Sequence, residues 1–249
     1  MKIPNIIHQI WIQGEDKIPS KLNSFYLNCQ KVNNNFKHEF WDNDRIINLL
    51  QEKFSPEHVD LYNRYTIFAQ KADFARYAIL YVHGGIYLDM DMVCIKNLSP
   101  FLKYGLFFTP KPFYKIFGGY LNGIIGVRPN HPVFKIVIKN IFDRQHINNV
   151  TKSTGTGLFY DSVIEYSKMS NDNDIMLVDN KYLHPCNIYN DESCPDTCKD
   201  CYIAHTNNSS WSPQLRFFKF LFKNKIIIII IILLIIIIIL IIKCKIISF

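Results

Sequence analysis

The sequence lacks three features that would assign it to familiar classes. Its first residues, Met1 to Gly14, do not combine a charged stub with an apolar core, as a secretory signal peptide does, and instead indicate a strand. No internal repeat divides the 249 residues, a length that suits one domain with a short appendage. The formal net charge is +7, but no stripe of Lys and Arg with interleaved aromatic residues crosses the body of the chain. We therefore expect no nucleic acid partner.

A long apolar run near the C-terminus is the clearest feature that is present. Every residue from Ile226 to Ile242 is Ile or Leu, and lysines flank the run on both sides. About 20 residues of helix span the hydrocarbon core of a bilayer, and flanking lysines reach the lipid headgroups. We predict one C-terminal transmembrane helix at about 226–242, within a segment 216–249 that follows a domain of residues 1–215. The alternative is a buried strand or an aggregation-prone tract, but a run without a polar face does not suit a globular surface.

Before this run, short apolar segments alternate with helical patterns. The expected strands are Ile6–Ile12, Lys37–Trp41, Ile86–Leu88, Leu106–Thr109 and Gly123–Val127, and the expected helices run from Asp42 or Asp44 to Leu50, over Tyr65–His83, from Pro132 to about Phe142 and over Gly157–Met169. Gly84-Gly85 supplies a stop for the long helix, because one residue there must adopt a left-handed conformation. Strands that alternate with helices predict an α/β domain with a mainly parallel sheet.

Two carboxylates follow the expected strand Ile86–Leu88. Asp89 and Asp91 are two residues apart, so in an extended segment their side chains lie on one face. Two such carboxylates repel each other unless a cation lies between them, and hard oxygen ligands suit Mg²⁺ or Mn²⁺. Ligands of α/β sheets bind at the carboxyl ends of strands. The pair therefore predicts a divalent metal site, whereas a lone Asp-x-Asp is more often a solvated turn.

Asp73 and Arg76 lie three residues apart on the preceding helix, so they face the same way. One interpretation is a local ion pair on an exposed face. The other is that Arg76 binds an anionic or sugar group while Asp73 accepts hydrogen bonds from hydroxyl groups. The spacing alone does not separate the two.

The segment from Ala72 to Asp91 resembles the sugar-binding region of glycosyltransferase family 32, which includes fungal Golgi α-mannosyltransferases, inositol-phosphoceramide mannosyltransferases and α-1,4-galactosyltransferases. Further resemblances follow in order along the chain: Ile3–Trp11 to the opening strand, Asn122 and Asn130-His131-Pro132 to the middle motif, Thr154–Gly157 to a Thr-Gly-Pro motif with Thr156 in place of proline, and His205 with Ser210-Trp211 to the closing motif. The resemblance covers roughly Lys2 to Trp211.

The resemblance implies a GT-A type fold, which is a Rossmann-like nucleotide-binding sheet, and sugar transfer with retention of anomeric configuration. It implies a nucleotide-sugar donor, GDP-mannose first and a UDP-hexose such as UDP-galactose or UDP-glucose next, and a glycan or glycolipid acceptor. Asp91 would bind Mn²⁺ or Mg²⁺ directly, Asp89 would bind the metal, the ribose or the sugar, and His205 would be a further metal ligand. The implied donor-binding residues are Ile10, Trp11, Asp73, Arg76, Tyr87, Asp89, Asn122 and Trp211, and the implied catalytic carboxylates are Asp73, Asp89 and Asp91. For Trp11 and His205, a purely structural role is the alternative.

Two other function classes stay open beside the transferase. A metal-dependent phosphohydrolase would use the same carboxylates but needs more acidic ligands at a two-metal site, which the sequence does not offer. A catalytically inactive, membrane-tethered sugar-binding module would explain why Thr156 replaces the proline of the family. The intact Asp89 and Asp91 pair argues against that alternative.

Four cysteines cluster shortly before His205. Cys198 and Cys201 have the C-x₂-C spacing of many zinc sites, and Cys186 and Cys194 precede them. A structural zinc site, two disulfides and free thiols are all consistent with this cluster. In a lumenal domain disulfides would be natural, and in a cytosolic domain zinc.

The side of the membrane on which the domain lies stays open at this stage. We expect a single-pass C-terminal anchor in an ER/Golgi-type membrane, with membrane lipid as a partner. A C-terminal helix without an N-terminal signal favours a cytosolic domain, as does the slight excess of basic residues before the run. Relatives of the family that act in the Golgi lumen favour the opposite side. The sequons Asn149-Val150-Thr151 and Asn207-Asn208-Ser209 would matter only in the lumen.

Overall fold

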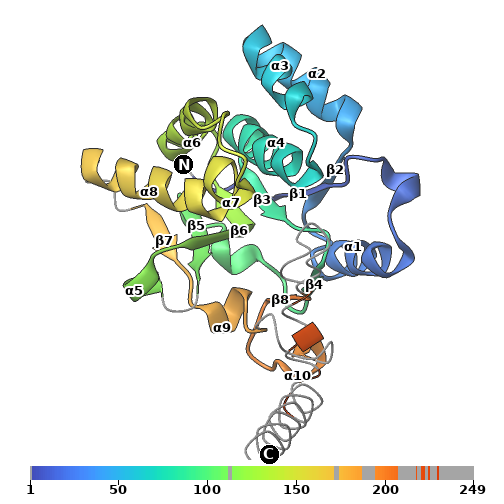
Figure 1. Ribbon diagram of the computed structural model, residues 1–249. Coiled ribbons are helices and arrows are strands. Elements are labelled where there is room, and N and C mark those ends of the chain that lie inside the picture. Colours follow the sequence, from blue (N-terminus) through green and yellow to red (C-terminus); the bar gives the residue numbers. More distant parts are fainter. Residues whose placement is uncertain are drawn as a thin grey trace, which may run out of the picture. The chain divides into compact units, whose positions relative to one another are not determined.

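A computed structural model of the chain describes residues 2–111, 114–170, 174–186 and 194–206, together with residues 217, 220, 221, 224 and 229 (Figure 1). The chain divides into two compact units, Met1–Cys186 with Glu192–Thr206, and Asn187–Asp191 with Asn207–Phe249. Two expectations lie outside the described residues, namely Trp211 as a donor-site residue and the domain boundary at 215/216. The expected membrane span at 226–242 also lies outside them, apart from Ile229. Among the residues that are described, no helix is both long and apolar enough to cross a membrane.

The elements of the first unit follow the alternation expected from the sequence. The strands are β1 (Ile6–Ile10), β2 (Lys37–Trp41), β3 (Gly85–Leu88), β4 (Met92–Cys94), β5 (Leu106–Pro110), β6 (Tyr120–Val127), β7 (Ile175–Leu177) and β8 (Ile203–His205). The helices are α1 (Ser20–Val32), α2 (Asn43–Lys53), α3 (Pro56–Arg64), α4 (Phe68–His83), α5 (Tyr114–Phe117), α6 (Pro132–Asp143), α7 (Val150–Ser153), α8 (Thr156–Met169), α9 (Asn180–Leu183) and α10 (Cys194–Thr197), with short 3₁₀ turns at Glu15–Lys17 and Ser99–Phe101.

Within the described residues, six strands form one sheet in the order β2-β1-β3-β6-β5-β7 (Figure 1). The pairs β1–β2, β1–β3 and β5–β7 are parallel, and β6 is antiparallel to both of its neighbours. Five strands therefore run one way and only β6 runs the other, which confirms the expected α/β fold with a mainly parallel sheet. β4 and β8 pair in a separate antiparallel ribbon.

Alternation of side chains along the strands creates one core on each face of the sheet. Tyr87 and Ile125 belong to a core that α2, α4, α6 and α8 cover, whereas Ile86 and Ile124 belong to a second core that includes Cys29 of α1. Neighbouring residues of a strand point to opposite faces, and both faces are apolar here, as expected for a mainly parallel sheet covered by helices.

Local signals set most of the element boundaries. The Asp42 side chain accepts a hydrogen bond from the Arg45 amide and caps α2 as expected, and Gly84 ends α4 with a φ of 63°. The expected helix over Tyr65–His83 was too long, because Tyr65 and Ile67 adopt extended conformations between α3 and α4. The strand expected to reach Ile12 ends at Ile10.

His8 of β1 connects its own strand to β2 and to the end of α4. Its Nε2 donates to the Gly84 carbonyl at 2.9 Å, and its Nδ1 accepts from Trp41 Nε1 at 3.1 Å. These two bonds require a neutral imidazole with its proton on Nε2. Burial lowers the pKa of His8 to about 3, which keeps the ring neutral.

Disulfides, and not zinc, account for the cysteine cluster. Cys186 is bonded to Cys194, and Cys198 to Cys201, so the expected zinc site at these four cysteines is wrong. The thiolate is the form of cysteine that binds zinc, and a sulfur bonded in a disulfide is not a thiolate. A further disulfide, which the sequence did not indicate, joins Cys29 of α1 to Cys94 of β4.

Candidate metal and donor site

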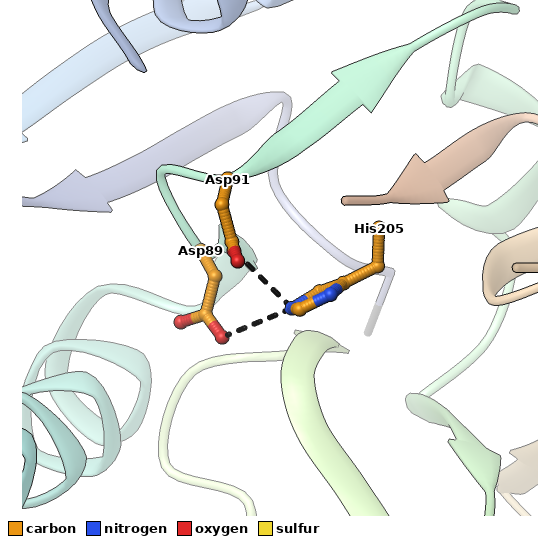
Figure 2. Close-up of side chains that lie close together, drawn as sticks. All are labelled: Asp89, Asp91 and His205. Atoms are coloured by element: carbon orange, nitrogen blue, oxygen red, sulfur yellow. Dashed lines mark ion pairs between the residues drawn. The ribbon is translucent and has the colours of Figure 1, made fainter. Parts of the chain in front are cut away.

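Three metal-ligating side chains converge at the end of β3 (Figure 2). Asp89 directly follows β3, Asp91 lies in the turn that leads into β4, and His205 is the last residue of β8. His205 Nε2 lies 3.2 Å from Asp91 Oδ1 and 3.9 Å from Asp89 Oδ2. One ligand atom from each residue lies within 4.8 Å of the other two, so the cluster has the size of a single ion site.

The ribbon of β4 and β8 brings His205 to the carboxylates of Asp89 and Asp91, which lie far earlier in the chain. Met92 faces His205 in the antiparallel register. The next residue, Thr206, donates from both its amide and its hydroxyl to the Asp91 carbonyl, at 3.0 and 2.9 Å. These bonds hold the Asp91 turn against the end of β8.

Arg76 of α4 connects the carboxylates. Its Nη2 lies 3.2 Å from Asp73 Oδ1 and 3.3 Å from Asp89 Oδ1, and its Nη1 donates to the Asn122 carbonyl at 2.6 Å. The guanidinium carbon lies 4.5 Å from the centroid of the Tyr87 ring. Arg76 is 6% exposed, so the interpretation as a local ion pair on an exposed face is wrong.

A buried polar network surrounds Asp73. Its Oδ1 accepts from Asn122 Nδ2 at 2.9 Å, and its Oδ2 accepts from the Thr154 hydroxyl at 3.1 Å. The same Asn122 amide donates to the Tyr77 hydroxyl at 2.9 Å. The three family motifs that contain Asp73, Asn122 and Thr154 therefore meet at one carboxylate.

The two carboxylates beside Arg76 have different electrostatic environments. Burial raises the pKa of the Asp73 carboxyl to about 6, although Arg76 opposes this shift. Burial acts in the same direction on Asp89, but the Arg76 guanidinium and the contact with His205 outweigh it and hold the pKa of Asp89 below its usual range. Asp89 is therefore ionised at neutral pH and able to bind a cation, and Tyr87 donates a hydrogen bond to its Oδ1 at 2.8 Å.

The donor set of the cluster fits a divalent metal. Two carboxylates and one imidazole suit Mn²⁺ or Mg²⁺ with further ligands from a phosphate. The side chains of Asp89, Asp91 and His205 are 28%, 14% and 16% exposed, so the cluster is reached from solvent. In the part of the chain that the structure describes, no second group of metal-ligating side chains adjoins this one, which a two-metal phosphohydrolase would need.

The other expected donor-site residues in the described part of the chain are Ile10, Trp11, Tyr87 and Asn122. Tyr87 and Asn122 belong to the network around Arg76, as described. Ile10 is buried in the core that α4 covers, and Trp11 packs against the small cluster of Leu22, Tyr26 and Met90, so their expected contact with a base stays a prediction.

Sequence reasoning missed three residues of the site. Gly123 of β6 accepts from the Asp89 amide at 2.9 Å, and a Cβ at this position would lie 2.7 Å from Asp89 Oδ2. Thr206 fixes Asp91, and its position beside His205 was the available signal. The ring of His184 stacks on that of His205 with centroids 5.1 Å apart, and nothing in the sequence connects these two histidines.

Comparisons with known proteins agree with this geometry. Residues 19–107 match the family model described as the glycosyltransferase sugar-binding region containing the DXD motif, and this range includes Asp73, Arg76, Asp89 and Asp91. An uncharacterized glycosyltransferase of Acanthamoeba polyphaga mimivirus is 62% identical over 226 residues, which cover 90% of each chain.

More distant relatives share part of the chain or the fold. Inositol phosphoceramide mannosyltransferase 1 of Schizosaccharomyces pombe is 31% identical over 150 residues, which cover 58% of this chain and 44% of the yeast protein. This chain therefore spans less than half of the length of that relative. The UDP-bound glycosyltransferase domain of the YGT toxin has a TM-score of 0.57 at 8% identity, with 71% of this chain and 80% of that chain covered. That similarity reflects a shared GT-A-like fold.

Proposed function

Because this chain belongs to the glycosyltransferase family that carries the DXD sugar-binding region, we propose that it transfers a hexose from a nucleotide-sugar to a glycan or glycolipid acceptor with retention of anomeric configuration. The observation that carries the proposal is the convergence of Asp89, Asp91 and His205 beside the buried Arg76. A metal-ligating cluster that adjoins a network of hydroxyl-binding groups suits a diphosphate linked to a sugar.

Each group of the site has a role in this proposal. Asp91, His205 and Asp89 hold the divalent ion, which when bound supplies a Lewis acid for the diphosphate leaving group. Arg76 keeps Asp89 ionised and oriented. Asp73 and Asn122 bind the donor sugar, and an ionised carboxylate near the anomeric carbon stabilises its oxocarbenium-like charge. The acceptor oxygen bonds to the anomeric carbon as the bond to the diphosphate breaks, and the acceptor proton passes to a diphosphate oxygen.

Mannose from GDP-mannose is the favoured sugar, with galactose or glucose from a UDP-sugar next. The support comes from relatives whose names include mannosyltransferase, such as the Schizosaccharomyces pombe protein. The names of these relatives also include inositol phosphoceramide, and this supports a glycolipid acceptor.

A donor panel tests this function. The purified chain is incubated with Mn²⁺ and, in turn, GDP-mannose, UDP-galactose, UDP-glucose and UDP-xylose, and the release of nucleoside diphosphate is measured with and without a glycolipid acceptor mixture. Release from one hexose donor that depends on Mn²⁺ and is lost in Asp91→Asn supports the proposal, because the amide loses the charge that holds a hard cation. Equal release in Asp91→Asn without metal would contradict it.

We further propose that a C-terminal membrane helix at about 226–242 anchors the chain in an ER/Golgi-type membrane with the catalytic unit in the lumen. The three disulfides support this side, since disulfides persist in oxidising compartments and are rare in the cytosol. Asn149 provides a reporter, because it is exposed and begins the sequon Asn149-Val150-Thr151.

The reporter decides the side of the membrane. In microsomes, we expect the full chain to resist carbonate extraction and to shift in mass on endoglycosidase treatment, with a smaller shift in Asn149→Gln. A chain that is extracted by carbonate would refute the anchor. The lumenal side would be refuted by a chain that is not glycosylated and that is digested by protease added to intact microsomes.

A further inference from the structure

His184 lies directly behind the metal-ligating histidine of the site. The rings of His184 and His205 are stacked, with centroids 5.1 Å apart and an angle of 29° between their planes. His205 Nε2 is the atom that approaches Asp91 and Asp89. His184 therefore contacts the face of the His205 ring, while Nε2 on the edge of that ring approaches the carboxylates.

Two tethers hold His184 at this position. The helix α9, which ends one residue before His184, is bonded to the main sheet because Thr109 donates to the Asn180 side chain at 2.5 Å. It is also bonded to the chain that leads into β8, because the Tyr202 amide donates to the Tyr182 carbonyl at 2.7 Å. His184 is thus placed by one side-chain bond to the main sheet and by one backbone bond to the segment that leads to His205.

The disulfides restrict the same segment. Cys186 follows His184 by two residues and is bonded to Cys194, and Cys201, bonded to Cys198, precedes β8 by two residues. Both histidines therefore lie close in sequence to a disulfide-bonded cysteine.

We propose that His184 is a positioning residue for the metal site: it fixes the ring orientation of His205 by stacking, and does not itself bind the ion. Ligating histidines are ordinarily oriented by groups outside the ligand set, and loss of such a group costs about 10–100-fold in metal affinity. An imidazole free to rotate about its side-chain bonds must be ordered on binding, and the stack removes that requirement in advance. The inference rests on the metal site of the proposed function.

A pair of substitutions of similar size separates stacking from packing. His184→Phe keeps a planar ring, whereas His184→Leu fills the space without one. The probe is Mn²⁺ alone, titrated into the full chain, with free Mn²⁺ followed by electron paramagnetic resonance. We expect His184→Leu to weaken Mn²⁺ binding about tenfold or more and His184→Phe to stay within about threefold of wild type. Melting without metal is recorded for each variant.

Tyr182→Leu is the matched control, because Tyr182 lies on the same helix and its ring faces Tyr202 rather than His205. It should change melting but not the Kd for Mn²⁺. Equal binding by wild type, His184→Leu and His184→Phe would overturn the inference while leaving the transferase proposal intact. Equal weakening in both His184 variants would also overturn it, since His184 would then be a ligand. If wild type binds no Mn²⁺ at all, the metal site of the proposed function fails with it.

Discussion

The buried Arg76 forms an ion pair with the partly exposed Asp89 that links the long helix α4 to the metal site, with Nη2 and Oδ1 3.3 Å apart. The guanidinium also meets Asp73, the Asn122 carbonyl and the Tyr87 ring. Because a planar fork makes all of these contacts at once, the arrangement depends on arginine and not only on a positive charge.

Arg76→Lys should therefore damage both catalysis and stability. Lysine keeps the charge but cannot meet Asp73, Asp89 and the Asn122 carbonyl together. We expect turnover to fall by roughly 10²-fold or more, as for loss of a positioned charge-assisted contact. We also expect the free energy of unfolding to fall by about 1–3 kcal/mol, as for a buried group left unsatisfied. Initial rates with the preferred donor and urea unfolding measure the two effects.

Arg45→Lys is the matched control for this substitution. Arg45 also pairs with a carboxylate, Glu39, and lies over an aromatic ring, Trp41, but its side chain is 46% exposed. Exposed ion pairs contribute about 0–1 kcal/mol, so this variant should retain its rate and most of its stability. If the two substitutions had equal effects, the assignment of Arg76 to the donor site would be wrong.

Gly123→Ala should displace Asp89 without any change of charge. The new Cβ would lie 2.7 Å from Asp89 Oδ2 and 3.0 Å from Met92 Cε, so the carboxylate must move. We expect the affinity for Mn²⁺ to fall by about tenfold, comparable to loss of a supporting group at a metal site. The affinity is measured by titration with Mn²⁺. Circular dichroism checks that the secondary structure of the variant is unchanged. Wild-type affinity would mean that Asp89 Oδ2 does not face the ion.

The sequence predicted the strands β1, β2, β3, β5 and β6 and the helices α2, α4, α6 and α8, because periodicity and caps are local signals. It did not predict α1, α3 or the short strands β4, β7 and β8. Asp42, Gly84 and the doubly apolar β1 identify a helix start, a helix end and a buried strand without knowledge of the rest of the chain. The reversed direction of β6 was not predicted, since nothing within Tyr120–Val127 encodes which neighbours it pairs with.

The site was predictable where a motif names a residue, and not where contact depends on tertiary structure. Asp89, Asp91 and His205 were expected together, and the structure brings them together. The stack of His184 on His205, the glycine opposite Asp89 and the Cys29–Cys94 disulfide join segments far apart in the chain, and no local pattern marks them. The spacing of Cys198 and Cys201 suits zinc and disulfides equally, so only the fold separated the two.

The Cys29–Cys94 disulfide should contribute more stability than the Cys198–Cys201 disulfide. It closes a loop of 65 residues, whereas Cys198–Cys201 closes one of 3. The chain-entropy model gives roughly 4 kcal/mol for the long loop and roughly 2 kcal/mol for the short one. Cys29→Ser/Cys94→Ser and Cys198→Ser/Cys201→Ser, compared by urea unfolding, measure this difference. Equal losses would mean that the reduced chain keeps α1 and β4 together by packing alone.

His8 should make the stability of the unit fall as the pH falls. Its pKa is about 3 in the folded chain, because burial disfavours the charged ring, and about 6.5 in an unfolded chain. Between these two values the unfolded chain binds a proton that the folded chain does not, so the free energy of unfolding decreases with falling pH.

The contribution of His8 to the free energy of unfolding is present in full above a pH of about 6.5. It is lost progressively toward pH 3, at up to about 1.4 kcal/mol per pH unit. His8→Gln has no ionisable group at this position, and all other titratable residues are common to both chains. The difference in slope between wild type and His8→Gln from pH 7 to pH 4.5, measured by urea unfolding, therefore isolates His8. Parallel slopes would mean that His8 takes up a proton in the folded state and gives up the bond that its Nδ1 accepts from Trp41 Nε1.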